Sequence, residues 1–451
     1  MPYDGQQASK GGHSFLIKNP DVSKFLDACD YMKTPGPDEG KSIAATYLPA
    51  PTDGGLPKLV VATDGSPFSD PISDAFPSTQ VGYVKTSFLC FDMTDFNGLV
   101  ASGSKFVDPH SVAEFHNKAK AIAFTLPGSN VRYKNSSTVQ DGFRLAIFEQ
   151  LSDNRTKIYA SGQTVLDTLF AICEDAIQFT NCPSCGDSSS SFSFKKGNEK
   201  AICKICNGHV YATDVMRIHE QISDYGDNGS AITRFMNAIE HLLMCTLIKT
   251  MFENNIEVLS SSAFVIDGPL ALFGQPAKIH APLLEFYNSV FKSCIAKGLP
   301  PPLIIGLQKD GQVMEHARSL SPFLAPDTYC VVSDEYRSKY INGISPRQTN
   351  FGHETYYGQD FIFKTASGYV FDVCLPYPIP NKTNRDEFAK LKCEPKIYEP
   401  WLARAFDLIR HLEFDLYENA VIPIALAHRH ASISLKPGGT MLDILTKKHL
   451  G

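Results

Sequence analysis

The sequence predicts a mixed α/β domain that carries a small four-cysteine insertion. Apolar strand-like runs alternate with segments of helical period along most of the chain, which indicates a sheet flanked by helices. Two Cys-x-x-Cys pairs lie in a polar stretch between such segments. We therefore expect a core formed by residues 58–180 and 209–451, an insertion at 181–208, and an N-terminal arm over residues 1–57.

Length and composition exclude several classes of protein. The 451 residues suffice for one large or two to three ordinary domains, and 43% of them are hydrophobic. The sequence has no run of about 18 apolar residues, so we expect no membrane span, and its first residues, MPYDGQQASKGG, do not resemble a signal peptide. The net charge of -6 argues against nucleic-acid binding by bulk charge but leaves room for a local basic groove.

The expected elements follow in order along the chain. The arm, rich in Gly, Pro, Asp and Lys, contains one helical stretch near residues 20–32. Apolar runs bounded by turn residues predict strands at 58–63, 82–91, 262–266, 303–307 and 328–333, and a hairpin over 360–375. Helical period predicts helices at 141–152 and 231–253, a helix from Pro400 to about Tyr417, and a short last helix from Pro423.

Four of the 12 cysteines form two pairs, Cys182 with Cys185 and Cys203 with Cys206. This spacing is typical of a zinc ribbon, in which each pair places two thiolates on one tight turn and four thiolates complete a tetrahedron. A redox dithiol needs only one pair, so we expect a structural zinc ion that folds the module and performs no chemistry. The other eight cysteines occur singly and are expected in the core, and the whole pattern indicates a reducing, cytoplasmic location.

Two of the predicted strands end in an Asp-Gly pair. Asp64 follows the run at 58–63, and Asp267 follows the run at 262–266. A carboxylate at the end of a buried strand, beside a Gly that lets a ligand approach the backbone, is a usual way to hold a hard metal ion. An ordinary Asp-Gly turn is the alternative, and two such pairs, each followed by Pro, bring the two interpretations near parity.

Three further side chains are candidates for the same site. Glu240 lies in the apolar stripe of the helix at 231–253, where a buried carboxylate needs a metal ion or an ion pair with a residue such as Arg234. His428 projects from the apolar segment IPIALAH, where a histidine packed in the core is the ordinary interpretation. Lys309 follows the run at 303–307, where a turn lysine is the default and a charge stabiliser is the alternative.

Asp64, Glu240, Asp267 and His428 together describe a two-metal site. Such a site holds two ions about 3.5–4 Å apart and stabilises the attacking and leaving oxygens of a phosphodiester. Oxygen-rich ligands favour Mg²⁺ or Mn²⁺, and the histidine favours Mn²⁺. The sequence has no GxSxG, Walker or HExxH motif that would indicate a different chemistry.

The order of these residues resembles that of the NurA family of DNA-repair and defence nucleases. The resemblance runs from about residue 58 to the C-terminus, through strand-Asp64-Gly-Ser, helix-Glu240, strand-Asp267-Gly, strand-Lys309 and a late Pro-x-x-x-Ala-His428 segment. It implies an RNase H-like core, with Asp64, Glu240, Asp267 and His428 as metal ligands. It also implies manganese-dependent DNA cleavage by a homodimer, with a hexameric ATPase of the HerA type as partner.

We therefore expect a cytoplasmic DNA nuclease that uses Mn²⁺ or Mg²⁺, carries structural Zn²⁺, and acts in DNA end processing or anti-phage defence. Lys309 would stabilise charge in the transition state. Two alternatives stay open at this point. In the first, the chain is a non-catalytic DNA-binding or scaffold subunit whose zinc ribbon binds DNA or a partner. In the second, it is a hydrolase of the same fold that acts on RNA.

Overall fold

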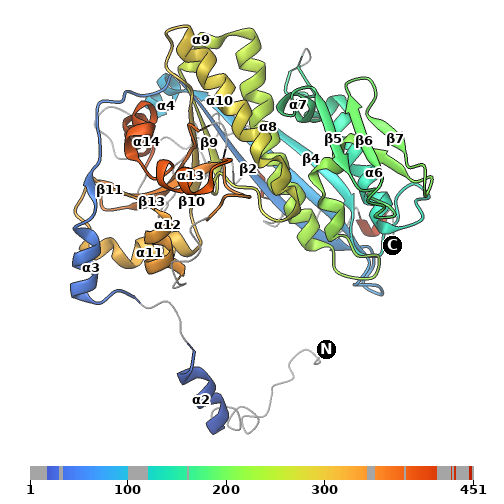
Figure 1. Cartoon of the computed structure of the whole chain (residues 1–451), viewed down its shortest axis with the longest axis horizontal. Helices are drawn as coiled ribbons and strands as arrows, with labels where there is room; N and C mark the ends of the chain where they lie inside the picture. The colour runs from blue at the N-terminus through green and yellow to red at the C-terminus, as the bar shows by residue number, and fades with distance from the viewer. Residues whose placement is uncertain are drawn as a thin grey trace.

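A nine-stranded mixed sheet forms the centre of the molecule, with helices packed against it (Figure 1). The computed structural model describes residues 18–29, 34–99, 120–159, 162–342, 351–379 and 382–413, together with His428, 431–432 and 446–448. Within these residues the strand order is β1-β11-β12-β13-β10-β9-β2-β3-β4. The predicted mixed α/β fold is thereby confirmed.

The sheet is parallel at its centre and antiparallel on both sides. Strand β9 pairs in parallel with β2 and with β10, and the other neighbours are antiparallel. The strands are β1 (Leu48–Pro49), β2 (Leu59–Pro71), β3 (Gln80–Asp92), β4 (Lys120–Pro127), β9 (Ser262–Asp267), β10 (Leu303–Gln308), β11 (Thr328–Val331), β12 (Gly358–Lys364) and β13 (Val370–Pro376). Every predicted core strand therefore exists, and the predicted hairpin is β12 and β13.

Two smaller sheets carry the cysteine pairs. One pairs β5 (Ala176–Thr180) with β6 (Ser191–Lys195), and the other pairs β7 (Lys200–Ile202) with β8 (His209–Tyr211). Their strands extend from residue 176 to residue 211, slightly beyond the expected insertion at 181–208. We call residues 176–211 the four-cysteine module.

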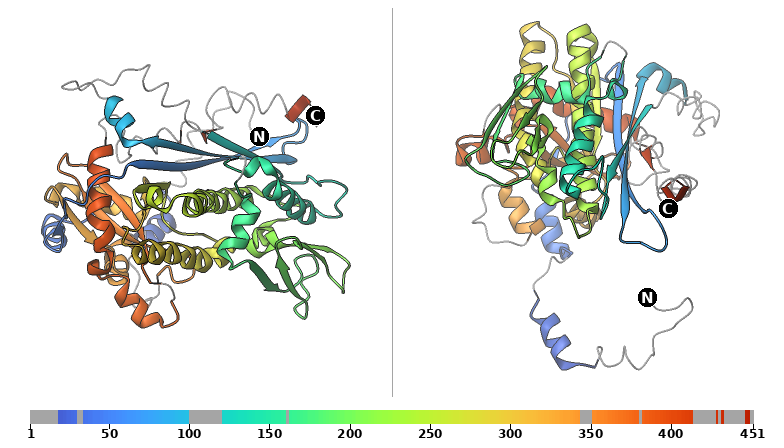
Figure 2. Two further views of the ribbon diagram at one scale, coloured as in Figure 1. Left: turned by 90° about the horizontal axis from the view of Figure 1, so that it is seen from above. Right: turned by 90° about the vertical axis from the view of Figure 1, so that its right-hand side faces the viewer.

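Helices cover the sheet and connect its strands. The longest, α8, packs on β2 and β3, and in Figure 2 it lies beside α10 on one face of these long strands. The helices are α2 (Pro20–Asp27), α3 (Pro37–Ala44), α4 (Met93–Leu99), α6 (Val139–Ser152), α7 (Val165–Ile172), α8 (Gly229–Asn254), α9 (Ile256–Ser260), α10 (His280–Ala296), α11 (Gln312–Leu320), α12 (Asp334–Tyr336), α13 (Arg385–Leu391) and α14 (Glu399–Leu412). Among the described residues, none of these helices has the length and apolar character needed to cross a membrane.

Part of the predicted N-terminal arm belongs to the folded body. Strand β1 pairs with β11, and Ile43 and Tyr47 are buried in an apolar cluster with Val313 and Tyr336. Helix α2, by contrast, has no buried residue. Residues 37–50 are therefore part of the α/β domain, whereas the boundary at residue 57 stays a prediction.

Two element boundaries differ from the predictions. The strand expected to end before Asp64 continues as β2 to Pro71, because residues 64–71 pair with β3 throughout. Helix α14 ends at Leu412, short of the expected Tyr417, because Glu413 is extended, with φ -64° and ψ 145°. The short helix predicted from Pro423 lies outside the described residues, apart from His428 and 431–432.

The eight single cysteines divide by burial. Cys245, Cys294, Cys330 and Cys374 are buried, and Cys90, Cys173 and Cys393 are half-buried, as expected for small apolar side chains. Cys29 is exposed, so its placement in the core was wrong. The physical reason is that it follows α2, which buries none of its side chains against the body.

Candidate active site and four-cysteine centre

Asp64 and Asp267 lie side by side on neighbouring parallel strands. Thr63 of β2 pairs with Ile266 of β9, so the next residue on each strand falls in the same row. Asp64 is only 4% exposed, and Asp267 is half-buried at the last position of β9. Gly268 then turns the chain away with a φ of 105°, a conformation that glycine adopts without strain.

Both carboxylates are bonded to further candidate residues. His428 Nδ1 lies 2.7 Å from Asp64 Oδ2, and Lys309 Nζ donates to Asp267 Oδ2 at 2.6 Å. The backbone N–H of Gly65 donates to Asp64 Oδ1 at 2.9 Å. One ligand atom each from Asp64, Asp267 and His428 lies within 4.8 Å of the other two. Three of the four predicted ligands therefore converge, with Lys309 beside Asp267.

The electrostatics of this cluster suit a bound cation. Burial raises the pKa of Asp64 to about 6, and the negative charge of Asp267 adds to the rise, while Lys309 and His428 oppose it. A divalent ion would replace the proton on such a carboxylate and remove the repulsion between the two acids. Two carboxylates and one imidazole are a donor set that fits Mg²⁺ or Mn²⁺.

Glu240 contacts the backbone of β2 and does not join these three ligand atoms. Its side chain comes from α8, is 4% exposed, and lies against Gly65 of β2. A Cβ at residue 65 would lie 2.8 Å from Glu240 Oε1, so the glycine is needed for this close approach. Neighbouring strand residues point to opposite faces, so Asp64 projects away from α8. Metal ligation by Glu240 stays a prediction.

Glu240 is nevertheless coupled to the cluster by charge. Burial raises its pKa well above the usual value, and the charges of Asp64 and Asp267 raise it further. The expected alternative, an ion pair with Arg234, does not occur in the described part of the chain, where the Arg234 guanidinium lies over the ring of Phe273. The helix therefore brings an unpaired buried carboxyl against the strand that carries Asp64.

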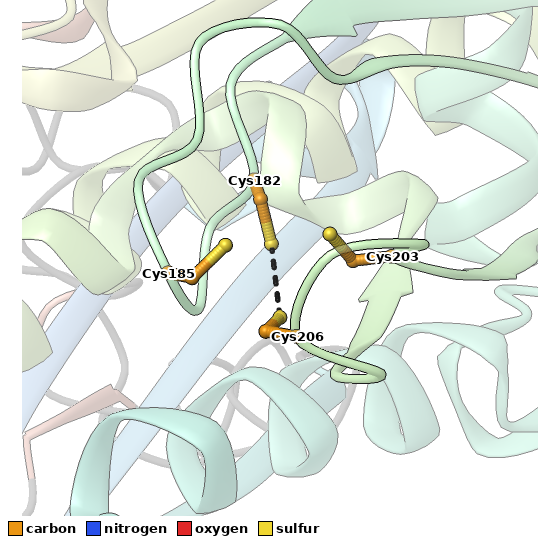
Figure 3. A group of neighbouring side chains, drawn as sticks. All are labelled: Cys182, Cys185, Cys203 and Cys206. Carbon is orange, nitrogen blue, oxygen red and sulfur yellow. Dashed lines mark hydrogen bonds between the residues drawn. The ribbon is translucent and has the colours of Figure 1, made fainter.

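The four paired cysteines converge from two tight turns, and Figure 3 shows their sulfurs turned toward one another. The sulfurs all lie within 4.8 Å of each other, with 3.7 Å between those of Cys182 and Cys206. The two turns have the same hydrogen bond: Gly186 N–H donates to the Cys182 carbonyl at 2.8 Å, and Asn207 N–H donates to the Cys203 carbonyl at 2.9 Å. The predicted convergence of these cysteines is confirmed.

Backbone amides favour the charged form of Cys203, whereas burial raises the pKa of Cys182 to about 12. Ile205 N–H donates to Cys203 Sγ at 3.4 Å, and Gly208 N–H donates to Cys206 Sγ at 3.3 Å. The amides of Cys206 and Ile205 lower the pKa of Cys203 to about 6. Metal binding requires thiolates, and four thiolates on two such turns are a donor set that fits Zn²⁺.

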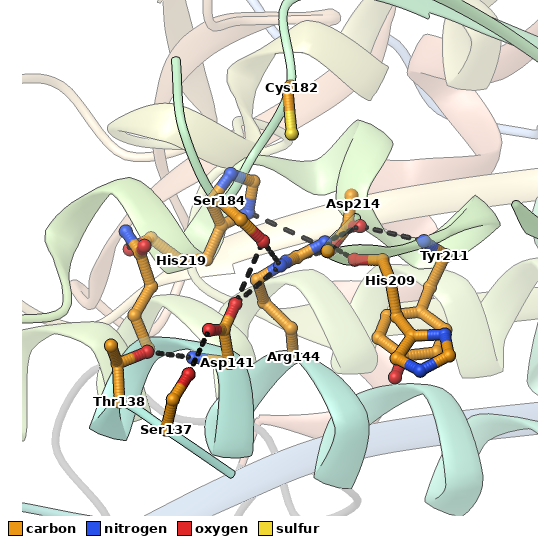
Figure 4. Close-up of polar contacts among 12 residues, drawn as sticks. Ser137, Thr138, Asp141, Arg144, Cys182, Ser184, His209, Tyr211, Asp214 and His219 are labelled. Carbon is orange, nitrogen blue, oxygen red and sulfur yellow. Dashed lines mark hydrogen bonds and ion pairs between the residues drawn. The ribbon is translucent and has the colours of Figure 1, made fainter. Parts of the chain in front are cut away.

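The polar residues that surround the four-cysteine module were not predicted from the sequence. Arg144 and Asp214, both buried, form an ion cluster with the half-buried Asp141 beside the first cysteine turn (Figure 4). One signal for a buried arginine was available in the sequence. Arg144 follows Phe143 in the predicted helix at 141–152, among the apolar residues that α6 buries. A buried arginine needs carboxylate partners, and these come from different elements.

The fold and the two clusters define a class: a mixed α/β protein with a carboxylate–histidine cluster on its central strands and a separate four-thiol centre. No family model matches the chain, and no curated protein matches it. Among solved structures, it is similar to the crystal structure of the NurA nuclease from Sulfolobus solfataricus, with 9% sequence identity and a TM-score of 0.39 over 98% of this chain and 97% of that chain. A likeness of this degree says nothing about activity, so the side chains must carry the functional assignment.

Proposed function

We propose that this chain is a metal-dependent nuclease that hydrolyses phosphodiester bonds of DNA. The observation that supports this most strongly is the convergence of Asp64, Asp267 and His428 at the centre of the sheet, within reach of one cation. When bound, Mg²⁺ or Mn²⁺ ions would supply positive charge to the attacking and leaving oxygens of a phosphodiester. The sequence contains no GxSxG, Walker or HExxH motif that would point to another common hydrolytic chemistry.

The side chains have distinct roles in this proposal. Asp64, Asp267 and His428 hold the cation, and Glu240 becomes a further ligand only if its carboxylate moves from its place against Gly65 toward these three side chains. The Lys309 side chain is 24% exposed beside Asp267, so its ammonium can reach both a ligand carboxylate and a phosphate oxygen. Its positive charge also keeps Asp64 more acidic than burial alone would allow.

Replacing either central carboxylate by its amide tests the proposal. Asp64→Asn and Asp267→Asn should each lower Mn²⁺-dependent cleavage of labelled DNA by about 1,000-fold or more, since metal charge stabilisation is worth several kcal/mol. The matched control is Asp74→Asn, in the same β2–β3 hairpin but 89% exposed, which should cleave like the wild type. Circular dichroism checks that every variant is folded. Wild-type activity in either central variant would overturn the site assignment.

The same assay separates the alternative functions. Wild-type cleavage of DNA that EDTA abolishes supports the nuclease, whereas cleavage of RNA but not DNA points to the RNA-specific hydrolase. Tight DNA binding without cleavage in Mn²⁺ or Mg²⁺ would instead favour a non-catalytic subunit that uses its four-cysteine module.

Finer features of the proposal rest on the family resemblance of the sequence. They are the RNase H-like core, the two-metal mechanism, the homodimer and the HerA-type ATPase partner. Light scattering of the purified chain measures its oligomeric state. Co-expression with the ATPase encoded nearest to its gene tests the partnership, and failure to co-purify would remove that partner without affecting the cleavage assay.

A further inference from the structure

A buried arginine connects the four-cysteine module to the core. Arg144 is a residue of α6, and it is only 2% exposed. Its Nε and Nη2 donate to the two carboxylate oxygens of Asp214 at 2.9 and 2.6 Å, and its Nη1 donates to Asp141 at 2.8 Å (Figure 4). The bidentate pair with Asp214 fixes the plane of the guanidinium, so its remaining donors point in set directions.

Those remaining donors contact the first cysteine turn and the strand β8 that follows the second. Nη1 donates to Ser184 Oγ at 2.7 Å, and Ser184 lies between Cys182 and Cys185. Nη2 donates to the carbonyl of His209 at 2.7 Å, three residues after Cys206. One side chain of the core therefore holds both halves of the module.

Ser184 contacts the Arg144 ion cluster and the second cysteine turn at once. Its hydroxyl donates to Asp141 at 2.9 Å as well as accepting from Arg144. A Cβ on Gly208 would lie 2.9 Å from Ser184 Oγ and 3.1 Å from Cys206 Sγ, so the second turn packs directly on this serine. The first turn also borders a cleft of about 910 Å³, while Cys182 and Cys203 are buried in the apolar core. Core packing and the contact at Ser184 thus position the two turns together.

We propose that Arg144 is a positioning residue of the four-cysteine site. It holds the two turns where four thiols converge, and a metal ion on those thiols in turn fastens the module to α6. The coupling is reciprocal: the factor by which docking tightens metal binding equals the factor by which metal tightens docking. The proposal needs a metal ion on the thiols but not the cleavage of DNA, so it stands or falls separately from the nuclease.

Ser184→Ala tests this coupling in the full-length chain with the least disturbance. Contacts behind metal ligands usually contribute 10–100-fold to metal affinity, so the Kd for Zn²⁺, measured by competition with a chromophoric chelator, should rise about 10-fold or more. Ser189→Ala is the matched control. Ser189 is an exposed serine of the same loop whose hydroxyl bonds only to Asp187 in the described structure, and its variant should bind Zn²⁺ like the wild type.

A second variant and a second readout guard against a folding defect. Removing Arg144 alone would leave Asp214 buried and uncompensated, so the paired change Arg144→Met with Asp214→Asn is the variant to use. Amide exchange of α6 should rise when Zn²⁺ is removed from the wild type, and should rise less in Ser184→Ala. Unchanged Zn²⁺ affinity in both the serine and the paired variant would overturn the proposal, as would a wild-type chain that binds no Zn²⁺.

Discussion

The two clusters of the molecule are assembled in opposite ways. The cysteines lie close in sequence, since Cys182 and Cys206 are 24 positions apart, and two short hairpins bring them together. The acidic cluster joins residues as distant as Asp64 and His428, which are 364 positions apart. The first cluster is determined by local turns, whereas the second exists only when the central strands of the sheet are in register.

The electrostatics of the two clusters also differ. At the cysteines, the shifts have both signs: backbone amides lower the pKa of Cys203, whereas burial raises the pKa of Cys182 to about 12. At the acids, burial and mutual repulsion raise the pKa of Asp64 and of Glu240. The acids belong to strands of the main sheet, which holds them in place. The thiols lie in a small module with little core of its own. Metal should therefore complete the fold of the module but only occupy the acidic site.

Removal of the thiol-bound metal gives the largest expected effect. If Zn²⁺ is present at about 1,000 times its Kd, it contributes about 4.1 kcal/mol, so its removal should lower amide protection of β5–β8 about 1,000-fold. Protection of β2, β9 and β10 should persist, because their hydrogen bonds lie in the main sheet. Hydrogen-exchange mass spectrometry with and without a strong chelator measures both regions.

Variants of single cysteines sharpen this experiment. Cys206→Ser should lose protection in the module without any chelator, and Cys29→Ser, at an exposed cysteine far from the module in sequence, should not. A module that keeps its protection after metal removal would show that its apolar contacts suffice and that the two clusters do not differ in this respect.

Lys309→Met has an intermediate effect, confined to the acidic cluster. It removes the ammonium bonded to Asp267, and kcat/KM for DNA cleavage should fall about 100-fold, the order seen when a charge-stabilising donor is lost. Since Lys309 also lowers the pKa of Asp64, the acid limb of the pH–rate profile should move to higher pH. Lys309→Arg keeps the charge and should keep the limb in place. A fall in rate with an unmoved limb in Lys309→Met would show that the lysine does not act on Asp64.

The elements around the acidic cluster were predictable because apolar period marks them in the sequence. The expected helix at 231–253 is α8 (Gly229–Asn254), and the expected strand at 262–266 is β9. The proximity of Asp64 and Asp267 could be predicted because two predicted strands both end in Asp-Gly. The continuation of β2 beyond Asp64 could not be predicted, because Gly-Ser-Pro is typical of a turn and its pairing with β3 is a tertiary contact.

Contacts between elements account for what the sequence could not show. The apolar stripe of α8 correctly predicted that Glu240 is buried. Its contact with Gly65, however, depends on how the helix crosses the sheet, which periodicity does not encode. The partners of Arg144 come from α6, the first cysteine turn, β8 and the residues after β8, so no spacing rule would have grouped them.

The smallest expected effect concerns stability and pH when the acidic site has no cation. The pKa of Asp64 is raised from an ordinary 3.8 to about 6, so between these values the folded state binds a proton more tightly than the unfolded state does. The contribution of Asp64 to the free energy of unfolding is therefore favourable at low pH and is lost as pH rises through about 6. The test uses protein loaded with Zn²⁺ but free of Mg²⁺ and Mn²⁺. The stability of Asp64→Asn minus that of the wild type should be larger at pH 7 than at pH 5.

Thermal unfolding at the two pH values measures this difference, at about 1 °C for each kcal/mol in a chain of 451 residues. The exposed Asp74→Asn variant should differ from the wild type by the same amount at both pH values. Added Mn²⁺ should abolish the advantage of Asp64→Asn at pH 7, because the ion stabilises the charged carboxylate that only the wild type has. If the stability difference between Asp64→Asn and the wild type did not depend on pH, the pKa of Asp64 would not be raised in the folded protein. The electrostatic contrast between the acids and the thiols would then disappear.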